Sequence, residues 1–540
     1  MDGQQTSRCS RSRRLNTGQR LLFGRAGWLV VASIALLVGV VGCEPPGRTA
    51  AERDNESEDR TRLKPAARVE SSDRMKPAER SGRSVFEVVD VKSDGDLSAR
   101  AAAEMAWRAV EDSRGYGETL VVWMFDDSPG ARSLVSEVSD YIANRYERDR
   151  IVEGRQPLRT AVGQFSETVT WHLEEPTTEN SKAAEAIRSV SSSGSEREVT
   201  FAAVAECIDH FKTTRLKFGV KTLFVLVTDE TGDDWEMVDD LVGKVSRYQM
   251  PVYVIGSPAP FGYRYYGEDR DKQYGPESRG LEMIKLSNWG GDVAMDVVDS
   301  GFGPFALEWL CRESGGVFMS VRPEGGRFVG AVGSSWPNGA SVRFPKDTMV
   351  RYAPDYVSAE KYQQLLASNK AISALAAAAK IGRQEMMSYP QLNFKSQNEA
   401  ALARSLTEAQ KSAARLGPQV NRMYDTLKEG QRHRDDITSP RWQAAFDLSF
   451  GRSCAAKVRV NGYNSMLAAL KRGMTFEDPN STMWVLESDN TISVATSLQN
   501  LSDRARLLLQ RVIDEHPNTP WAMMADRELQ TPIGWKWTER

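Results

Sequence analysis

The strongest constraint on the fold comes from three uninterrupted apolar runs between residues 118 and 330. These runs are "TLVVWMF", "KTLFVLVT" and "PVYVIGS". A strand that is covered by helices on both faces of a parallel sheet is apolar along its whole length. Segments with helical spacing, such as "RSLVSEVSDYIANRY" and "WEMVDDLVGKVSRY", separate the runs. We therefore predict an α/β, Rossmann-like domain with a mainly parallel central sheet covered by helices.

Other segments of this domain fit the same alternation. We expect short strands at "AVGQFS", "TVTWHL" and "VFMSV", and helices at "KAAEAIRSV", "TFAAVAECIDHF" and "ALEWLCRESGG". Residues 258–303 interrupt the pattern with a stretch rich in Tyr, Gly and charge. So long an insertion is either a functional part of the sheet rim or merely a long loop.

Residues 1–43 have the pattern of an export signal. A basic leader precedes the uncharged run "AGWLVVASIALLVGVVG", and its arginines are Arg8, Arg11, Arg13, Arg14, Arg20 and Arg25. The run ends in "VVGC", which resembles the lipobox of bacterial lipoproteins and implies acylation of Cys43. An uncleaved transmembrane anchor is the alternative, because the run is close to the minimum length of a membrane span. Both alternatives predict a membrane-anchored, extracytoplasmic protein on the periplasmic or cell-surface face.

The charged, proline-containing stretch 44–84 has almost no large apolar residues and is expected to be a disordered linker. A lead-in strand and helix should occupy 85–117. From 344 to 540 we expect an all-α domain, because helical periodicity dominates there. Its end resembles one tetratricopeptide helical hairpin. Three tryptophans near the C-terminus would either anchor a partner or dock onto their own domain: Trp521, Trp535 and Trp537.

Polar oxygen residues follow the predicted strands at positions that would meet at one edge of the sheet. Asp126 and Ser128 follow the first apolar run, Asp229 follows "LFVLVT", and Thr200 begins "TFAAVAE". In open parallel sheets, ligands bind outside the carboxyl ends of the strands. Residues 118–330 resemble the von Willebrand factor A domain, whose metal-ion-dependent adhesion site uses a D-x-S-x-S loop, a threonine and an aspartate. The resemblance implies metal ligands at Asp126, Ser128, Thr200 and Asp229.

Such hard oxygen ligands suit Mg²⁺ or Mn²⁺, with one coordination position left for a carboxylate of a partner. The sequence departs from the family pattern at Gly130, which stands where the second serine belongs. The adhesion site is therefore degenerate. Each candidate also has a purely structural alternative: Ser128 and Thr200 would cap helices, and Asp229 would close a turn with Thr231 and Gly232.

The resemblance and the export signal together predict a non-catalytic protein that recognises a protein or peptide partner at the sheet rim. A structural scaffold or assembly factor that acts through the helical domain, with a metal-free A domain, is the alternative. A nucleotide-binding enzyme is a weaker one, based on the G-x-G-x-x-A spacing at Gly301 and Gly303. The net charge of −3 argues against nucleic acid as a partner. The scattered cysteines Cys207, Cys311 and Cys454 are expected to be buried and free.

Overall fold

The computed structural model describes residues 97–149, 156–191, 197–259, 261, 283–286, 300–321, 344–381 and 389–540. The expected export signal with Cys43, the linker 44–84, the lead-in strand and most of the insertion 258–303 lie outside these residues. Among the described residues, no helix has both the length and the hydropathy needed to cross a membrane.

A six-stranded sheet has the order β3-β2-β1-β4-β5-β6. Its strands are β1 Thr119–Asp126, β2 Leu158–Phe165, β3 Val169–Thr177, β4 Lys221–Thr228, β5 Val252–Gly256 and β6 Phe318–Ser320. Every neighbouring pair is parallel except β2 and β3, which are antiparallel. This order is that of doubly wound, Rossmann-type sheets, so the predicted mainly parallel sheet is confirmed.

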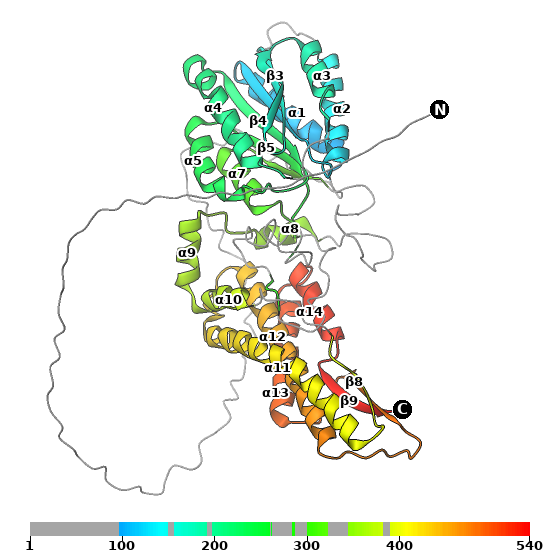
Figure 1. Cartoon of the computed structure of the whole chain (residues 1–540). Coiled ribbons are helices and arrows are strands. Elements are labelled where there is room, and N and C mark those ends of the chain that lie inside the picture. The colour runs from blue at the N-terminus through cyan, green and yellow to red at the C-terminus, as the bar shows by residue number, and fades with distance from the viewer. Residues whose placement is uncertain are drawn as a thin grey trace, which may run out of the picture. The chain divides into compact units, whose positions relative to one another are not determined.

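Helices cover both faces of this sheet (Figure 1). One face packs against α1 Ala99–Gly115, α2 Arg132–Arg148 and α3 Asn180–Arg188, and the other against α4 Thr200–Phe218, α5 Val238–Tyr248 and α7 Phe305–Ser314. A short 3-10 helix, Trp235–Met237, precedes α5. Alternate residues of β1 point to opposite faces. Trp123 and Phe125 lie in the hydrophobic core between the sheet and α1 to α3. Val122 and Met124 lie in the core between the sheet and α4, α5 and α7.

The chain from residue 344 onward is mostly helical. Its helices are α8 Lys346–Met349, α9 Ala359–Ser368, α10 Lys370–Ile381, α11 Glu399–Gly430, α12 Pro440–Lys471, α13 Thr496–Glu515 and α14 Pro520–Gln530, with 3-10 turns at Val350–Tyr352 and Gln431–His433. The expected helix pair at the end of the chain is present as α13 and α14. It is followed by a strand rather than by a further helix of a repeat.

This region also contains an antiparallel sheet, so the prediction of an all-α domain was wrong. Strands β7 Asn393–Lys395, β8 Met483–Asp489 and β9 Gly534–Glu539 pair in that order. Each strand is short, and its partners lie far away in the sequence. A short segment such as "GWKW" therefore forms a strand because it pairs with distant segments, and the local sequence does not predict that pairing.

The C-terminal tryptophans pack onto their own region. Trp521 is fully buried, with its ring 5.3 Å from that of Tyr352. The Trp535 indole N–H donates to the Arg459 carbonyl at 2.8 Å, and that of Trp537 donates to the Met466 carbonyl at 3.3 Å. The prediction that these tryptophans dock onto their own domain is thus confirmed. The three cysteines are buried and free, as expected.

Candidate metal centre

The carboxyl ends of β1 and β4 lie side by side and position the two predicted aspartates. Asp126 is the last residue of β1, and Asp229 directly follows β4. Asp126 has the same parity along β1 as Val122 and Met124, which face α4. Its side chain therefore leaves the sheet on the face where α4 begins with Thr200.

The Asp126 carboxylate is fully buried and held by two donors. The Ser128 backbone N–H donates to Oδ1 at 2.7 Å, and the Thr228 hydroxyl donates to Oδ2 at 2.7 Å. Burial raises the pKa of Asp126, although these hydrogen bonds oppose the rise. The orientation of this carboxylate is thus fixed by the chain itself before any ligand binds.

Glu198 is a third acid of the site, and the sequence analysis missed it. Asp126, Glu198 and Asp229 each offer a carboxylate oxygen, and these oxygens all lie within 4.8 Å of one another. Glu198 is only 3% exposed, and its Oε2 has no hydrogen-bond partner within the described residues. Burial, followed by repulsion from Asp126, raises the pKa of Glu198 to about 10. A metal-free site therefore holds a proton at neutral pH.

Backbone hydrogen bonds fix the loop that carries Glu198. The Asp233 N–H donates to the Glu198 carbonyl at 2.7 Å, and the Val199 N–H donates to the Ser166 carbonyl at 2.9 Å. The only sequence signal for Glu198 was its position two residues before Thr200 in "SEREVTF". The adhesion-site pattern includes the threonine but not this acid, so the sequence did not predict Glu198 as a ligand.

Thr200 does not cap its helix, so the capping alternative is wrong for this residue. Asp234 performs that task, because its carboxylate accepts the N–H groups of Phe201 at 3.1 Å and Ala202 at 2.7 Å. The Thr200 side chain is fully buried, and its hydroxyl has no hydrogen-bond partner among the described residues. A Cβ at Gly232 would lie 2.6 Å from this hydroxyl oxygen, so Gly232 gives Thr200 the room it occupies.

Ser128 agrees in part with the capping alternative. Its hydroxyl accepts the Ala131 N–H at 3.3 Å, but α2 begins only at Arg132. The same hydroxyl interacts with Glu198 and offsets a small part of the rise in the pKa of that carboxyl group. In the turn after β4, the Thr228 hydroxyl accepts the Glu230 N–H at 3.2 Å, and Gly232 adopts a φ of 99°.

The residues present fit a divalent cation. Three loops converge with carboxylate oxygens, and buried polar atoms of Glu198 and Thr200 have no hydrogen-bond partner among the residues that the structure describes. An orphaned buried oxygen is costly unless it binds a proton, a water or an ion. Hard, oxygen-only ligand sets of this kind select Mg²⁺, Mn²⁺ or Ca²⁺ over soft metals.

A second acidic cluster, Asp447 with Glu515 and His516, does not fit a metal. Arg434 lies 2.6 Å from the Asp447 carboxylate, and Arg511 contacts the same group. Burial and the Arg434 charge lower the pKa of His516 to about 4. Two guanidinium groups already neutralise this site, so it is an internal ion-pair network.

The glycines of the possible nucleotide motif have a packing role. A Cβ at Gly303 would lie 2.5 Å from the Phe318 ring, so Gly303 lets the start of α7 approach β6 closely. Pro304 directly precedes α7. The segment that would supply the preceding strand of a nucleotide motif, 287–299, lies outside the described residues.

No protein-family model matches the sequence, and neither does any curated protein. Among solved structures, the chain is similar to BatB, a conserved hypothetical protein from Bacteroides thetaiotaomicron, with 14% identity over 38% of this chain and 90% of that one and a TM-score of 0.24. An aerotolerance-related membrane protein from Bacteroides fragilis matches at 15% identity over 38% and 91%, also with a TM-score of 0.24. The N-terminal domain of TFIIH p34 matches at 8% identity over 26% and 81%, with a TM-score of 0.21.

Proposed function

We propose that the carboxylates at the carboxyl ends of β1 and β4 form a divalent-cation site of the von Willebrand factor A type. The observation that carries this proposal is the convergence of Asp126, Glu198 and Asp229 within 4.8 Å. Ser128 and Thr200 would add hydroxyl oxygens. Glu198 compensates for the hydroxyl that Gly130 lacks, because it brings a further anionic oxygen to the same point.

The proposed activity is binding rather than catalysis. A Mg²⁺ or Mn²⁺ ion held by these residues would supply a coordination position for a carboxylate of a protein or peptide partner. The basic leader and Cys43 would tether the chain to a membrane and place this site on the extracytoplasmic side. The competing proposal is a scaffold that acts through the region from residue 344 onward and needs no metal.

The test is thermal unfolding of the full-length chain in detergent, with Mg²⁺ or Mn²⁺ against chelator. A ligand that binds only the folded state stabilises it by about 2.7 kcal/mol at a hundredfold excess over its dissociation constant. We expect that gain in the wild type and its loss in Asp126→Ala. The matched control is Asp209→Asn on α4, because Asp209 is exposed and pairs with Lys212 of the same helix at 2.6 Å. An equal gain in Asp126→Ala, or none in the wild type, would favour the scaffold.

A further inference from the structure

A cavity of about 440 Å³ lies between α11, α12 and α13, within the region from residue 344 onward. Its lining combines three cationic side chains with one carboxylate, an excess of two positive charges. The cations are Lys428, Lys457 and Arg504, and the carboxylate is Asp425. Cavities of this volume commonly accommodate small molecules.

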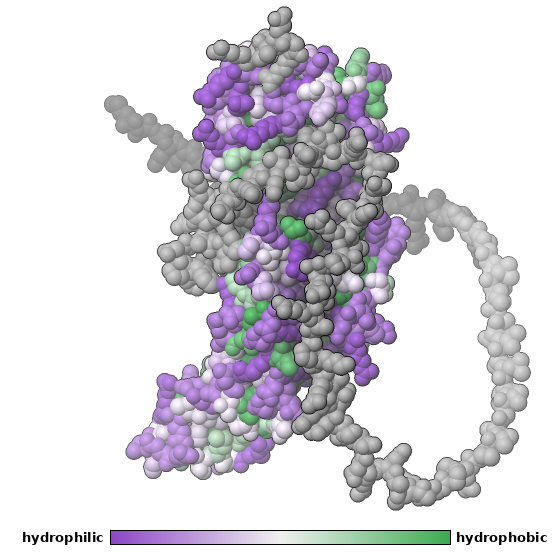
Figure 2. Space-filling view, turned by 180° about the vertical axis from the view of Figure 1, so that it is seen from behind, coloured by the Kyte–Doolittle hydropathy of each residue, from purple (hydrophilic) through white to green (hydrophobic). Residues whose placement is uncertain are grey.

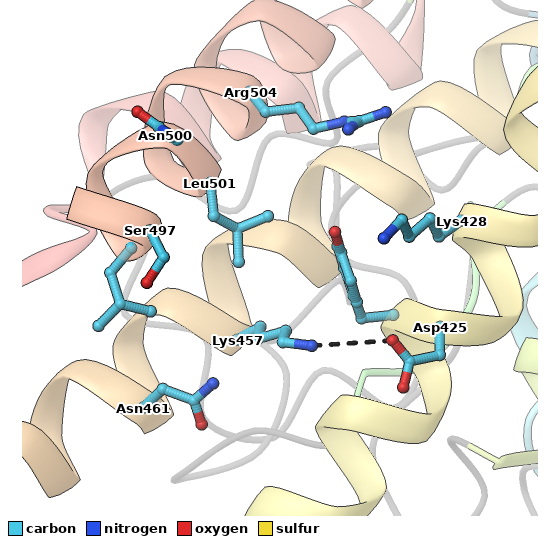
Figure 3. Close-up of a pocket in the computed structure, with 10 residues that line it drawn as sticks. Asp425, Lys428, Lys457, Asn461, Ser497, Asn500, Leu501 and Arg504 are labelled. Carbon is cyan, nitrogen blue, oxygen red and sulfur yellow. Dashed lines mark ion pairs between the residues drawn. The ribbon is translucent and has the colours of Figure 1, made fainter. Parts of the chain in front are cut away.

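The carboxylate neutralises only one of the three cations. Asp425 lies 3.8 Å from the Lys457 ammonium group, which also sits 4.0 Å from the centre of the Tyr424 ring. Among the described residues, neither Lys428 nor Arg504 has a carboxylate within ion-pair distance. Figure 3 shows these two side chains extending from α11 and α13 into the space between the helices. An anion in that space would be attracted by both charges.

The start of α13 adds to the positive potential of this cavity. Ser497 and Asn500, in the first turns of α13, line it, and Asn461 of α12 lies across from Ser497 (Figure 3). Within the described part of the chain, no side chain caps the first N–H groups of α13, and its first turn has no acidic residue. A helix N-terminus attracts anions through its dipole and its unsatisfied N–H groups.

The described surface on the side that Figure 2 shows is mainly hydrophilic. There, small hydrophobic areas are scattered among hydrophilic side chains. Among the described residues that line the cavity, Leu498 and Leu501 are the only aliphatic ones, and both are at least half-buried. The recognition chemistry of this site is therefore electrostatic.

We propose that this cavity binds a phosphate monoester. Such a group carries close to two negative charges at neutral pH, which matches the charge excess, and its oxygens accept hydrogen bonds from ammonium, guanidinium and amide donors. A carboxylate would neutralise only half of the excess. The ester is either a soluble metabolite or the head group of a lipid, and the two sources share this chemistry.

The experiment is calorimetric titration of the full-length chain in neutral detergent with inorganic phosphate, glycerol 3-phosphate and dihexanoyl phosphatidic acid. All three probes should bind. Similar affinity for the last two identifies a soluble ester, whereas much tighter binding of the lipid identifies a head group. Lys428→Gln and Arg504→Gln should each weaken binding about tenfold, because each removes one charge-assisted contact.

The matched control is Lys411→Gln, which removes the same charge from α11 at an exposed position where Lys411 pairs with Glu408 at 2.8 Å. Its affinity should equal that of the wild type. Absence of binding at millimolar phosphate overturns the proposal. Affinities that are unchanged in both pocket variants, or equally weakened in the control, also overturn it. So does tight binding of an acidic peptide by a chain that ignores all three phosphates.

Discussion

The Asp229 carboxylate oxygen Oδ2 lies 2.8 Å from the point that a Cβ would occupy at Gly130. The glycine that breaks the D-x-S-x-S pattern therefore makes room for an acid from the loop after β4. A hydroxyl is lost at position 130, but a carboxylate lies where that side chain would be. The site is thus built from more charge and fewer hydroxyls than the family pattern implies.

Restoring the family serine should weaken the site rather than repair it. Gly130→Ser places a Cβ against Asp229 and pushes that carboxylate out of the cluster. We expect the dissociation constant for Mn²⁺ to rise about tenfold, which corresponds to roughly 1.4 kcal/mol. Calorimetric titration measures it, and Gly130→Ala is the control. A serine variant that binds more tightly than the alanine variant would show that the hydroxyl acts as a ligand.

The stability of the metal-free protein should fall as the pH rises. The pKa of Glu198 is raised from 4.5 to about 10, so the folded state binds a proton that the unfolded state releases. The stabilisation that this proton gives the folded state is complete below pH 4.5 and is lost as the pH rises toward 10. Calorimetric melting in chelator should show this slope, and Glu198→Gln should flatten it. The same slope in the variant would assign the effect to another group.

The sheet could be predicted from the sequence because each of its signals is local. Apolar runs such as β4 are buried on both faces, and the intervening helices have their own periodicity. Asp126 and Asp229 could also be placed, since both directly follow such runs. Glu198 could not, because its role depends on burial beside acids from two other loops. Strands β7 to β9 were missed for a similar reason, since each is stabilised only by distant partners.

Asp234 should contribute to stability through the start of α4. Its carboxylate accepts two N–H groups there, so Asp234→Ala should lower the free energy of unfolding by about 1 kcal/mol, a typical cost of losing a helix cap. Urea unfolding measures the difference. The control is Asp233→Ala, which removes an exposed neighbouring carboxylate. Equal losses in both variants would contradict the capping role.

The Asp447 network should matter for folding and not for metal binding. Asp447→Ala leaves Arg434 and Arg511 without their shared buried partner, and breaking such a network costs about 3–5 kcal/mol. We expect a large drop in the unfolding midpoint with an unchanged affinity for Mn²⁺. Loss of a bound ion in this variant would instead make Asp447, Glu515 and His516 a metal site.

The tether prediction depends on Cys43. Cys43→Ser should abolish both acyl labelling and membrane retention of the full chain, because the thiol is the expected acylation site. Fractionation with metabolic lipid labelling measures both properties. A variant that loses the label but stays in the membrane would instead have an uncleaved transmembrane anchor.

Equilibrium dialysis against Mn²⁺ is the decisive measurement for the metal centre, because it counts bound ions without requiring a partner. We expect one ion per full-length chain, lost in Asp126→Ala and Glu198→Gln and retained in Asp209→Asn. No bound ion in the wild type, or an ion that survives both substitutions, would contradict a metal centre built from Asp126, Glu198 and Asp229.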